Sequence, residues 1–171
     1  MMIISPKAAF EIRPVRSEEY GAVGSLTMDV YVGEGYIDPQ SPYVAELSDA
    51  EARARAADVL VAVREGVVLG SLTMARPATP YADIARAGEL EFRMLAVAKQ
   101  ARGLGVGTAL VRTVIDTARR EGFAAVVLTT MAPMVDARRI YDRFGFVHVP
   151  ERDWAARPGS SLMTVMRLAL R

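Results

Sequence analysis

The chain has no cysteine, one histidine and one tryptophan among its 171 residues. The absence of cysteine excludes disulfides, thiol nucleophiles and cysteine-ligated metal sites, and it leaves the redox compartment open. The single histidine, His148, supports neither a metal site nor a catalytic triad. Because the acidic residues also show no spacing typical of metal ligands, the sequence predicts no metal cofactor.

Long hydrophobic runs and an excess of one charge are also missing. No run approaches the ~18 apolar residues that a membrane-spanning helix requires. The 21 basic and 20 acidic side chains give a net charge of +1, so no electrostatic argument favours a nucleic-acid partner. The apolar stretch within residues 1–6 is too short for a signal peptide, and a proline interrupts it too early. We therefore expect a soluble, cytoplasmic protein with no nucleic-acid or membrane partner.

Size and hydrophobic patterning indicate one globular domain over residues 1–171, with residues 1–9 as an N-terminal extension. Apolar residues in period-two and period-3.6 patterns alternate along the chain. Strands are expected at 10–16, 59–64, 67–75, 89–97, 125–130, 146–149 and 163–170. Helices are expected at 20–30, from a capping box at Ser48 to about 57, at 106–120 and at 133–144. This order predicts an α/β (α+β) fold, in which helices pack on a mixed sheet.

The loop after the strand at 89–97 is the most informative segment. Gly103, Gly105 and Gly107 stand at every second position and allow a ligand to approach the backbone closely. The helix that follows directs its unpaired N–H groups toward the same place, which makes an anion site with phosphate as the usual occupant. Arg102 adds a permanent positive charge.

Three phosphate-binding patterns can be compared with this loop. A dinucleotide fingerprint, Gly-x-Gly-x-x-Gly, would need glycine where Thr108 stands, and a P-loop would need a lysine that is absent. The pattern Arg/Gln-x-x-Gly-x-Gly/Ala is met in full by Arg102, Gly105 and Gly107. A second segment, from Ala137 to Phe146, reads Ala-x-x-x-Tyr-x-x-x-Gly-Phe.

With these two segments the chain resembles the GCN5-related N-acetyltransferase (GNAT) superfamily. The resemblance implies a mixed, mostly antiparallel central sheet of six or seven strands flanked by about four helices. It also implies acetyl-CoA as co-substrate, with the pantetheine arm along the strand and the pyrophosphate on the loop. The residues that would hold acetyl-CoA are Leu95, Ala96, Val97, Arg102, Gly103, Leu104, Gly105, Val106, Gly107 and Thr108.

The resemblance assigns Tyr141 as the general acid that protonates the departing CoA thiolate. A core tyrosine on an apolar helix face is the alternative from residue type alone. Glu91 and Glu89 are candidate bases for an amine substrate, directly or through water. Without a bulge, strict alternation would place Glu91 on one face of the strand with Arg93 and Leu95. The alternative to a role as base is that Glu91 forms a structural ion pair with Arg93.

The acceptor side is less defined by the sequence. The family's asparagine near the start of the tyrosine-bearing helix is replaced by Met134. A loop at 33–42 falls where the fold places its acceptor-binding wall, and either packing of that loop or an amine pocket would explain its aromatic residues. The candidates there are Tyr31, Tyr36, Tyr43 and Trp154, with Glu34 and Asp38 as acids suited to a cationic amine.

The resulting expectation is an N-acetyltransferase that transfers an acetyl group from acetyl-CoA to a primary amine. Attack would be direct, within a ternary complex, because no cysteine can carry an acyl-enzyme. The acceptor would be a small-molecule or peptide amine. A non-catalytic acyl-CoA-binding module and an acetyltransferase for protein N-termini or lysines are the two rivals. The oligomeric state stays open, with a homodimer as one option.

Overall fold

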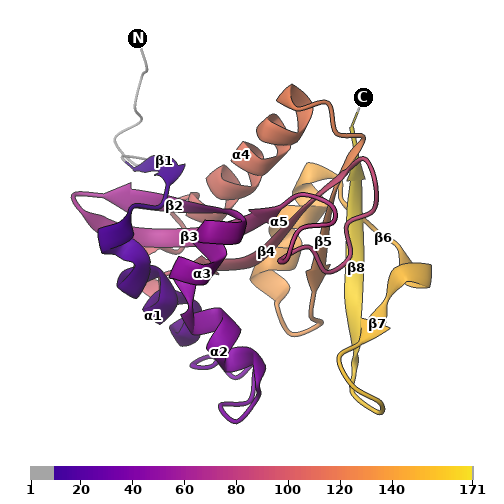
Figure 1. Cartoon of the computed structure of the whole chain (residues 1–171), viewed down its shortest axis with the longest axis horizontal. Coiled ribbons are helices and arrows are strands. Elements are labelled where there is room, and N and C mark those ends of the chain that lie inside the picture. Colours follow the sequence, from indigo (N-terminus) through magenta and orange to yellow (C-terminus); the bar gives the residue numbers. More distant parts are fainter. Residues whose placement is uncertain (1–9, 171) are drawn as a thin grey trace.

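The computed structural model describes residues 10–170, so the expected extension at 1–9 lies outside the described residues. A mixed sheet with strand order β1-β2-β3-β4-β5-β8-β6 crosses the molecule, and the short β7 pairs with β8 (Figure 1). Its pairs are antiparallel except for β4 with β5. The strands are β1 (Glu11–Pro14), β2 (Asp58–Arg64), β3 (Val67–Ala75), β4 (Glu89–Val97), β5 (Ala125–Thr130), β6 (Val147–His148), β7 (Trp154–Ala155) and β8 (Leu162–Ala169).

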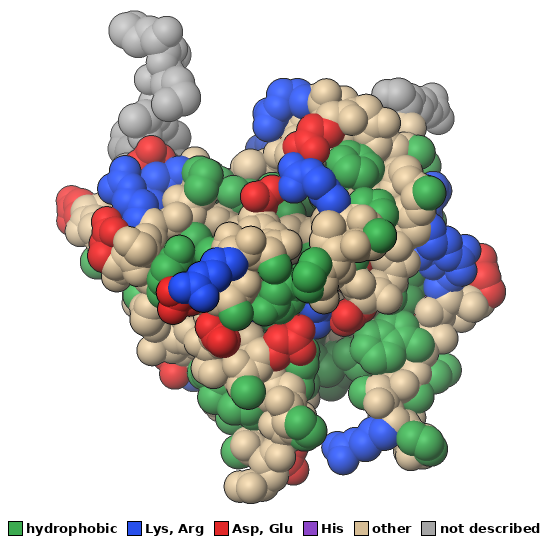
Figure 2. Space-filling model, viewed as in Figure 1, with side chains coloured by type: hydrophobic (Ala, Val, Ile, Leu, Met, Phe, Trp, Pro, Cys, Tyr) green, Lys and Arg blue, Asp and Glu red, His purple; other side chains and the backbone are tan. Residues whose placement is uncertain are grey.

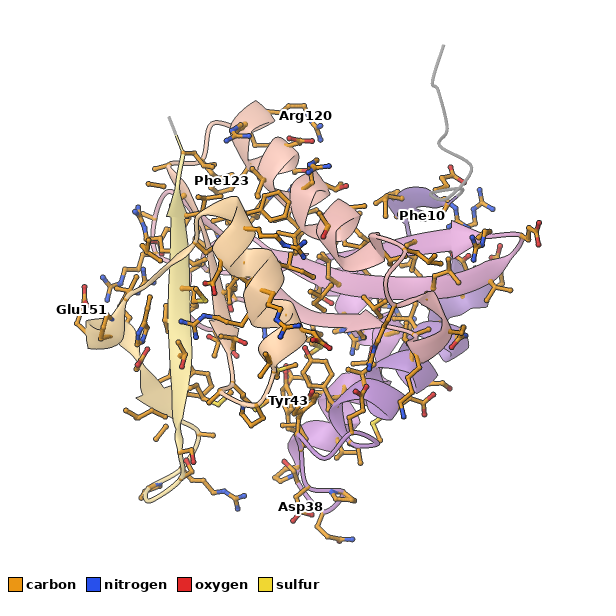
Figure 3. The ribbon with its side chains drawn as sticks, turned by 180° about the vertical axis from the view of Figure 1, so that it is seen from behind. Phe10, Asp38, Tyr43, Arg120, Phe123 and Glu151 are labelled. Atoms are coloured by element: carbon orange, nitrogen blue, oxygen red, sulfur yellow. The ribbon has the colours of Figure 1, made fainter. Side chains whose placement is uncertain are left out.

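Helices cover both faces of this sheet. α1, α2 and α3 lie on one face and α4 and α5 on the other, as the front and rear views agree (Figures 1 and 3). Their bounds are α1 (Tyr20–Tyr31), α2 (Tyr43–Ser48), α3 (Ala50–Ala56), α4 (Val106–Arg120) and α5 (Val135–Phe144). Three short 3-10 turns lie at Ser17–Glu19, Lys99–Ala101 and Pro150–Arg152. The mixed, mostly antiparallel sheet expected from the sequence is confirmed.

Some elements differ from the expectation at their ends or were missed. The helix expected from Ser48 begins one residue later, because Asp49 is its N-cap and accepts the N–H of Ala52 at 3.0 Å. α5 begins at Val135 rather than at residue 133, since the Val135 N–H is turned back to the Pro133 carbonyl. α2 has six residues and β7 has two. Both are too short to show a periodic pattern, so the sequence did not predict them.

β4 contains a bulge that decides which way its side chains point. Ser71 on β3 pairs with Ala96, but Thr73 pairs with Arg93, so β4 has one extra residue over this stretch. Met94, within it, has a φ of +58°, a left-handed conformation that is uncommon for a residue with a side chain. The extra residue shifts the alternation of the strand by one position.

The bulge separates residues that strict alternation would keep together. Arg93 faces the α1–α3 side, where it bonds the Tyr43 hydroxyl, and Glu91 shares that side. Val97 instead lies against the first turn of α4, and Leu95 shares its side. The expectation that Glu91 and Arg93 share a face with Leu95 therefore fails, because it held only for an unbulged strand.

The same region is where β4 and β5 part. The two strands pair only over residues 89–92 of β4 and 125–128 of β5. β5 continues to Thr130 in register with β8, whereas the rest of β4 pairs only with β3. From Arg93 onward β4 thus has one edge without a strand partner, which leaves backbone groups available at the centre of the sheet.

Helix α4 packs so closely on the sheet that a glycine is needed beneath it. A Cβ on Gly70 of β3 would lie 2.6 Å from Val106 Cγ1 and 3.1 Å from the Ala96 carbonyl oxygen. Such distances require α4 or β4 to move. Gly21 on α1 is the opposite case, because a Cβ there would meet nothing within 4 Å.

Gly70→Ala is expected to lower the free energy of unfolding by about 1–3 kcal/mol through overpacking. Gly21→Ala, the matched control, is expected to raise it by roughly 0.5–1 kcal/mol, since it only removes backbone freedom inside a helix. Urea denaturation measures both. Equal effects of the two substitutions would contradict the close packing of α4 on β3.

Candidate functional site

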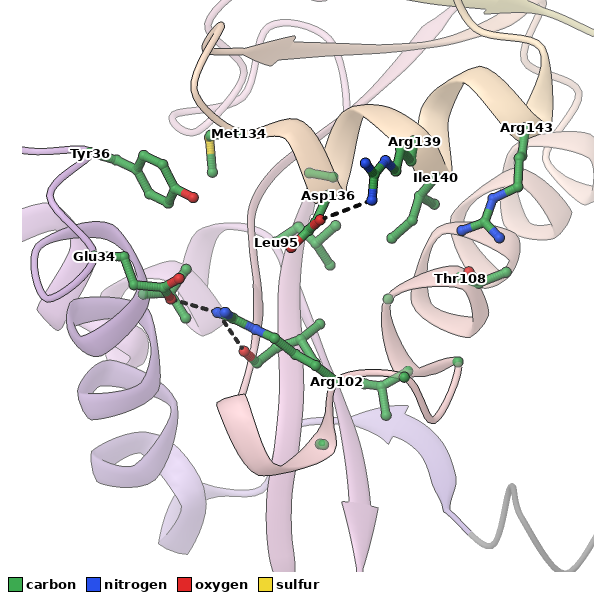
Figure 4. Close-up of a pocket in the computed structure, with 18 residues that line it drawn as sticks. Glu34, Tyr36, Leu95, Arg102, Thr108, Met134, Asp136, Arg139, Ile140 and Arg143 are labelled. Carbon is green, nitrogen blue, oxygen red and sulfur yellow. Dashed lines mark hydrogen bonds and ion pairs between the residues drawn. The ribbon is translucent and has the colours of Figure 1, made fainter.

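A first cavity of about 510 Å³ lies between the end of β4, the loop that follows it, and the helices α1 and α5 (Figure 4). It brings together eight of the ten residues assigned to acetyl-CoA. These are Leu95, Val97, Arg102, Gly103, Gly105, Val106, Gly107 and Thr108. Ala96 and Leu104 do not line it; Ala96 is 1% exposed and is packed in the core between its strand neighbours.

The three glycines of the loop have two different physical roles. Gly103 and Gly105 both have a φ of +82°, so each occupies a left-handed conformation that a side chain would strain. Gly105 is also the N-cap of α4, whose first N–H groups have no intrahelical partner, and no side chain among residues 10–170 caps them. Gly107 has an ordinary φ, but a Cβ there would lie 2.8 Å from Ile140 Cδ1. Gly103 and Gly105 therefore shape the loop before α4, and Gly107 leaves room for the Ile140 side chain of α5.

Positive side chains surround this helix terminus. Arg102, Arg139 and Arg143 all line the first cavity. Arg102 extends across the cavity and donates a hydrogen bond of 2.5 Å to Glu34, as Figure 4 shows. This bond, opposed by partial desolvation, raises the pKa of Arg102. Arg139 lies 3.7 Å from Asp136. An anion in the cavity would therefore compete with Glu34 for the Arg102 guanidinium.

A second cavity, of about 550 Å³, adjoins the first. Both are lined by Tyr36 and Met134, so Met134, at the position of the family's asparagine, lies where the two meet. In Figure 2 the surface is hollowed between the segment around α2 and the loop that joins β7 to β8, and hydrophobic side chains form the floor. The residues expected to form the acceptor wall are all found here: Tyr31, Tyr36, Tyr43 and Trp154.

The two acidic residues expected near the acceptor are divided between the cavities. Asp38 lines the second cavity and lies on the outlying loop labelled in Figure 3, with Tyr43 nearer the centre of the molecule. Glu34 lines the first cavity instead and is paired with Arg102. A role of Glu34 in binding a cationic amine is therefore not favoured by its position.

Tyr141 lies in an aromatic cluster beside the place where β4 and β5 part. Its ring packs edge-on against Phe92 at 5.8 Å and Phe146 at 5.9 Å between centroids, and the residue is 5% exposed. Burial raises the pKa of Tyr141, and no charge or hydrogen bond from the described residues opposes the shift. Burial, and secondarily Tyr141, also raises the pKa of Tyr31, whose hydroxyl donates to the Leu95 carbonyl at 3.1 Å. The Tyr141 side chain lines neither cavity.

Neither Glu91 nor Glu89 is placed as a base exposed to substrate would be. Glu91 is fully buried and lines neither cavity, and its Oε1 accepts the N–H groups of Ile84 and Ala85 at 2.9 and 3.0 Å. Burial raises the pKa of Glu91, although those two hydrogen bonds oppose the shift. Burial would also raise the pKa of Glu89. Hydrogen bonds from the Arg152 side chain, the Arg86 backbone N–H and the Arg167 side chain outweigh burial and lower that pKa to about 2.

Two features of the second cavity were not found from the sequence. Arg93 does not pair with Glu91 but with Glu46 at 3.3 Å and Asp83 at 3.0 Å, which come from α2 and from the loop before β4. The hydroxyl of Thr130, at the end of β5, is buried without a hydrogen-bond partner in the described part of the chain. No local sequence signal joins segments so far apart, and only the bulge and the parting strands bring them to one cavity.

The first cavity fits an acyl-CoA. It combines an uncapped helix terminus and several arginines for phosphate groups with a free strand edge for an amide-bearing arm. The sequence matches the acetyltransferase (GNAT) family over residues 23–146. The chain belongs to the GNAT family.

Solved GNAT structures share the architecture. A GCN5-related N-acetyltransferase from Kribbella flavida is 28% identical, with a TM-score of 0.69, and the match covers 97% of this chain and 100% of that one. A GNAT family acetyltransferase from Brucella melitensis, solved in complex with acetyl-CoA, is 23% identical, with a TM-score of 0.64 over 96% and 90% of the two chains. The second likeness concerns the fold alone.

Curated relatives match over a shorter region. N-acetylaspartate synthetase from Rattus norvegicus is 34% identical over 112 residues, which are 63% of this chain and 34% of that protein. The matched part of the chain thus spans about a third of the length of such relatives. Among residues 10–170, no helix is long and apolar enough to cross a membrane, and no group of three or more His, Cys, Asp or Glu residues could hold a metal ion.

The pair of Arg102 with Glu34 leads to a prediction about donor binding. Glu34→Gln removes a negative charge from the first cavity and frees Arg102, so the affinity for acetyl-CoA is expected to rise roughly twofold to fivefold. Isothermal titration calorimetry measures the change. Glu51→Gln, which breaks an exposed pair with Arg55 on α3, is the control and should leave the affinity unchanged. Weaker binding by Glu34→Gln would show that Glu34 supports the donor site instead of competing with it.

Proposed function

We propose that this GNAT protein is an N-acetyltransferase that transfers an acetyl group from acetyl-CoA to a small primary amine. The observation that carries the proposal is the meeting of two cavities where β4 and β5 part. One cavity has the anion-binding loop of residues 102–108, and the other is walled by aromatic side chains. Such an arrangement suits a donor and an acceptor held at the same time.

The donor would be held mainly by backbone groups. The N–H groups at the start of α4, with Arg102, would bind the pyrophosphate, and Arg139 and Arg143 are further cations of the same cavity. Along Leu95–Val97, the edge of β4 without a strand partner would bond the amides of the pantetheine arm like an added strand. This use of backbone explains why glycines, rather than charged side chains, dominate the loop.

Transfer would proceed by direct attack. The amine nitrogen attacks the thioester carbonyl, the carbon–sulfur bond breaks, and the proton lost by nitrogen balances the proton gained by sulfur. The chain has no cysteine to carry an acyl-enzyme. A backbone N–H near Leu95–Val97 would stabilise the oxyanion. The raised pKa of Tyr141 keeps its hydroxyl protonated, so Tyr141 is the proposed hydrogen-bond donor to the departing sulfur. Because its side chain lines neither cavity, this role requires its hydroxyl to become accessible when acetyl-CoA binds.

The group that accepts the proton lost by the amine nitrogen is the role that the geometry of the site constrains least. Glu89 is held by two arginines and has a pKa of about 2, which makes it a poor base. Glu91 has the raised pKa that suits a base, but its carboxylate lines neither cavity. Water in the second cavity is the acceptor we favour, with Glu91 as the remaining side-chain candidate.

A small acceptor is favoured over a protein one. The second cavity lies between two arms of the chain, residues 36–46 and 154–163, so an acceptor is enclosed from both sides. A protein lysine or N-terminus would need an open groove. A location in the cytoplasm and assembly as a homodimer stay predictions from the sequence.

The activity is tested by following CoA release from acetyl-CoA with a panel of primary amines. Tyr141→Phe is expected to lower kcat about 100-fold, because it removes the hydroxyl that stabilises the leaving sulfur. Its dissociation constant for acetyl-CoA should stay within about twofold of wild type. Unchanged turnover would remove the role of Tyr141. Saturable acetyl-CoA binding with no turnover of any amine would favour the non-catalytic alternative.

Glu91→Gln distinguishes between two roles for Glu91, that of a catalytic base and that of a buried structural carboxylate. The folded pKa of Glu91 lies above its ordinary value of 4.5, so the folded state retains a proton that the unfolded state has lost, and stability falls as the pH rises through this window. The variant is therefore expected to match wild type near pH 4 and to have the higher Tm near pH 8. Its pH profile of kcat/KM should be that of wild type. A flattened alkaline-rising limb would instead identify Glu91 as the base.

A further inference from the structure

Thr130 lines the second cavity and has a buried hydroxyl without a partner among the described residues. The residue is 3% exposed, lines the cavity, and its Oγ1 has no hydrogen-bond partner within residues 10–170. A buried hydroxyl without a partner destabilises the folded protein. Thr130 stands at the end of β5, where this strand has left β4, so a group that enters between the two strands comes close to this residue.

Arg93 lines the same cavity, but its hydrogen-bonding capacity is already used. One terminal nitrogen donates to Glu46 and to the Tyr81 carbonyl, and the other contacts the Tyr43 hydroxyl and Asp83, all between 3.0 and 3.3 Å. These four acceptors match the four N–H groups of the two terminal nitrogens. The side chain is 9% exposed, and its guanidinium also lies 5.8 Å from the centre of the Tyr43 ring. A carboxylate from a substrate could bind Arg93 only by displacing one of these partners.

The carboxylates around Arg93 remain accessible. The Glu46 and Asp83 side chains are 37% and 43% exposed, and both line the second cavity. The other charged residues of this cavity are Asp38 and Arg157. Three carboxylates therefore face two guanidinium groups, and the surplus is negative. Such a wall attracts an ammonium group and repels a carboxylate.

The rest of the second cavity is mainly apolar, although Ser41, Thr129, Ser160 and Ser161 also line it. Four aromatic residues and several methionines line it, so it suits a flat, hydrophobic body. Its volume of about 550 Å³ lies within the range of small-molecule sites.

From these observations we infer that the acceptor is a primary amine on an aromatic or other apolar body, without a carboxylate beside the nitrogen. Glu46 and Asp83, held in place by Arg93, attract its ammonium form, and the Thr130 hydroxyl bonds the amine nitrogen as it enters between β4 and β5. An α-amino acid with the same side chain is disfavoured, because its carboxylate meets the negative surplus of this wall. This inference rests on the proposed function and names the substrate class of the same site.

Tryptamine and tryptophan test the inference, since they share the indole body and differ by one carboxylate. Wild type is expected to show at least about tenfold higher kcat/KM for tryptamine. In the double variant Glu46→Gln with Asp83→Asn, which keeps acceptors for Arg93, this preference should fall toward unity. Asp116→Asn, which removes an exposed charge on α4 outside both cavities, is the matched control and should keep it. Equal or better use of tryptophan by wild type would overturn the inference and point to Arg157 or Arg93 as a carboxylate receptor.

Thr130→Val gives an independent test that does not depend on charge. The Thr130 hydroxyl makes no bond within the described chain, so its removal is expected to leave Tm unchanged or raised. The kcat/KM for tryptamine should fall about tenfold, while the affinity for acetyl-CoA stays the same. An unchanged kcat/KM would show that Thr130 does not contact the acceptor.

The same assays distinguish failure of the proposed activity from failure of the inferred substrate class. If no amine releases CoA although acetyl-CoA binds, the proposed transferase activity fails. If other amines are acetylated but tryptamine has no advantage over tryptophan, only the substrate class fails.

Discussion

The parting of β4 from β5 is the constraint on which the site depends. Parallel strands normally continue side by side, and their hydrogen bonds would then consume the backbone groups of β4. Here the pairing ends after four residues, and the bulge at Met94 follows at once. Beyond this point the first cavity opens beside the start of α4 and the second beside Thr129 and Thr130 of β5, so the proposed substrates would meet at an edge inside the sheet rather than at its rim.

In the proposed donor site, glycine and arginine have different roles. The positive φ values of Gly103 and Gly105 shape a loop that ends in an uncapped helix terminus, which is a fixed feature of the backbone. Arg102, in contrast, is a long side chain already bonded to Glu34. Glu34 belongs to the segment that leads from α1 toward Tyr36, which lines both cavities. The ion pair thus connects the loop after β4 to the segment that forms one wall of the second cavity.

The sequence predicted most of the framework and the donor loop, but little of the acceptor site. β4 and β5 were predicted with the bounds that the structure gives, because both are apolar or alternating runs closed by turn residues. The three glycines and the pattern around Tyr141 are local, so spacing alone was informative. The bulge in β4 was not predicted, since it arises from the pairing with β3, and it reversed the sides of Leu95 and Val97. Arg93 with its acidic partners joins segments 47 and 10 residues away, and no local pattern encodes such a contact.

The two glutamates of β4 acquire a structural meaning from this long-range organisation. Glu91 accepts the N–H groups of Ile84 and Ala85, the residues that directly follow Asp83. Arg152, bonded to Glu89, donates to the Ile84 carbonyl at 2.7 Å. Both carboxylates therefore fix the loop that brings Asp83 to Arg93. A buried carboxylate need not reach the substrate to matter for transfer: by holding this loop, Glu91 sets the position of the negative charge that faces the second cavity.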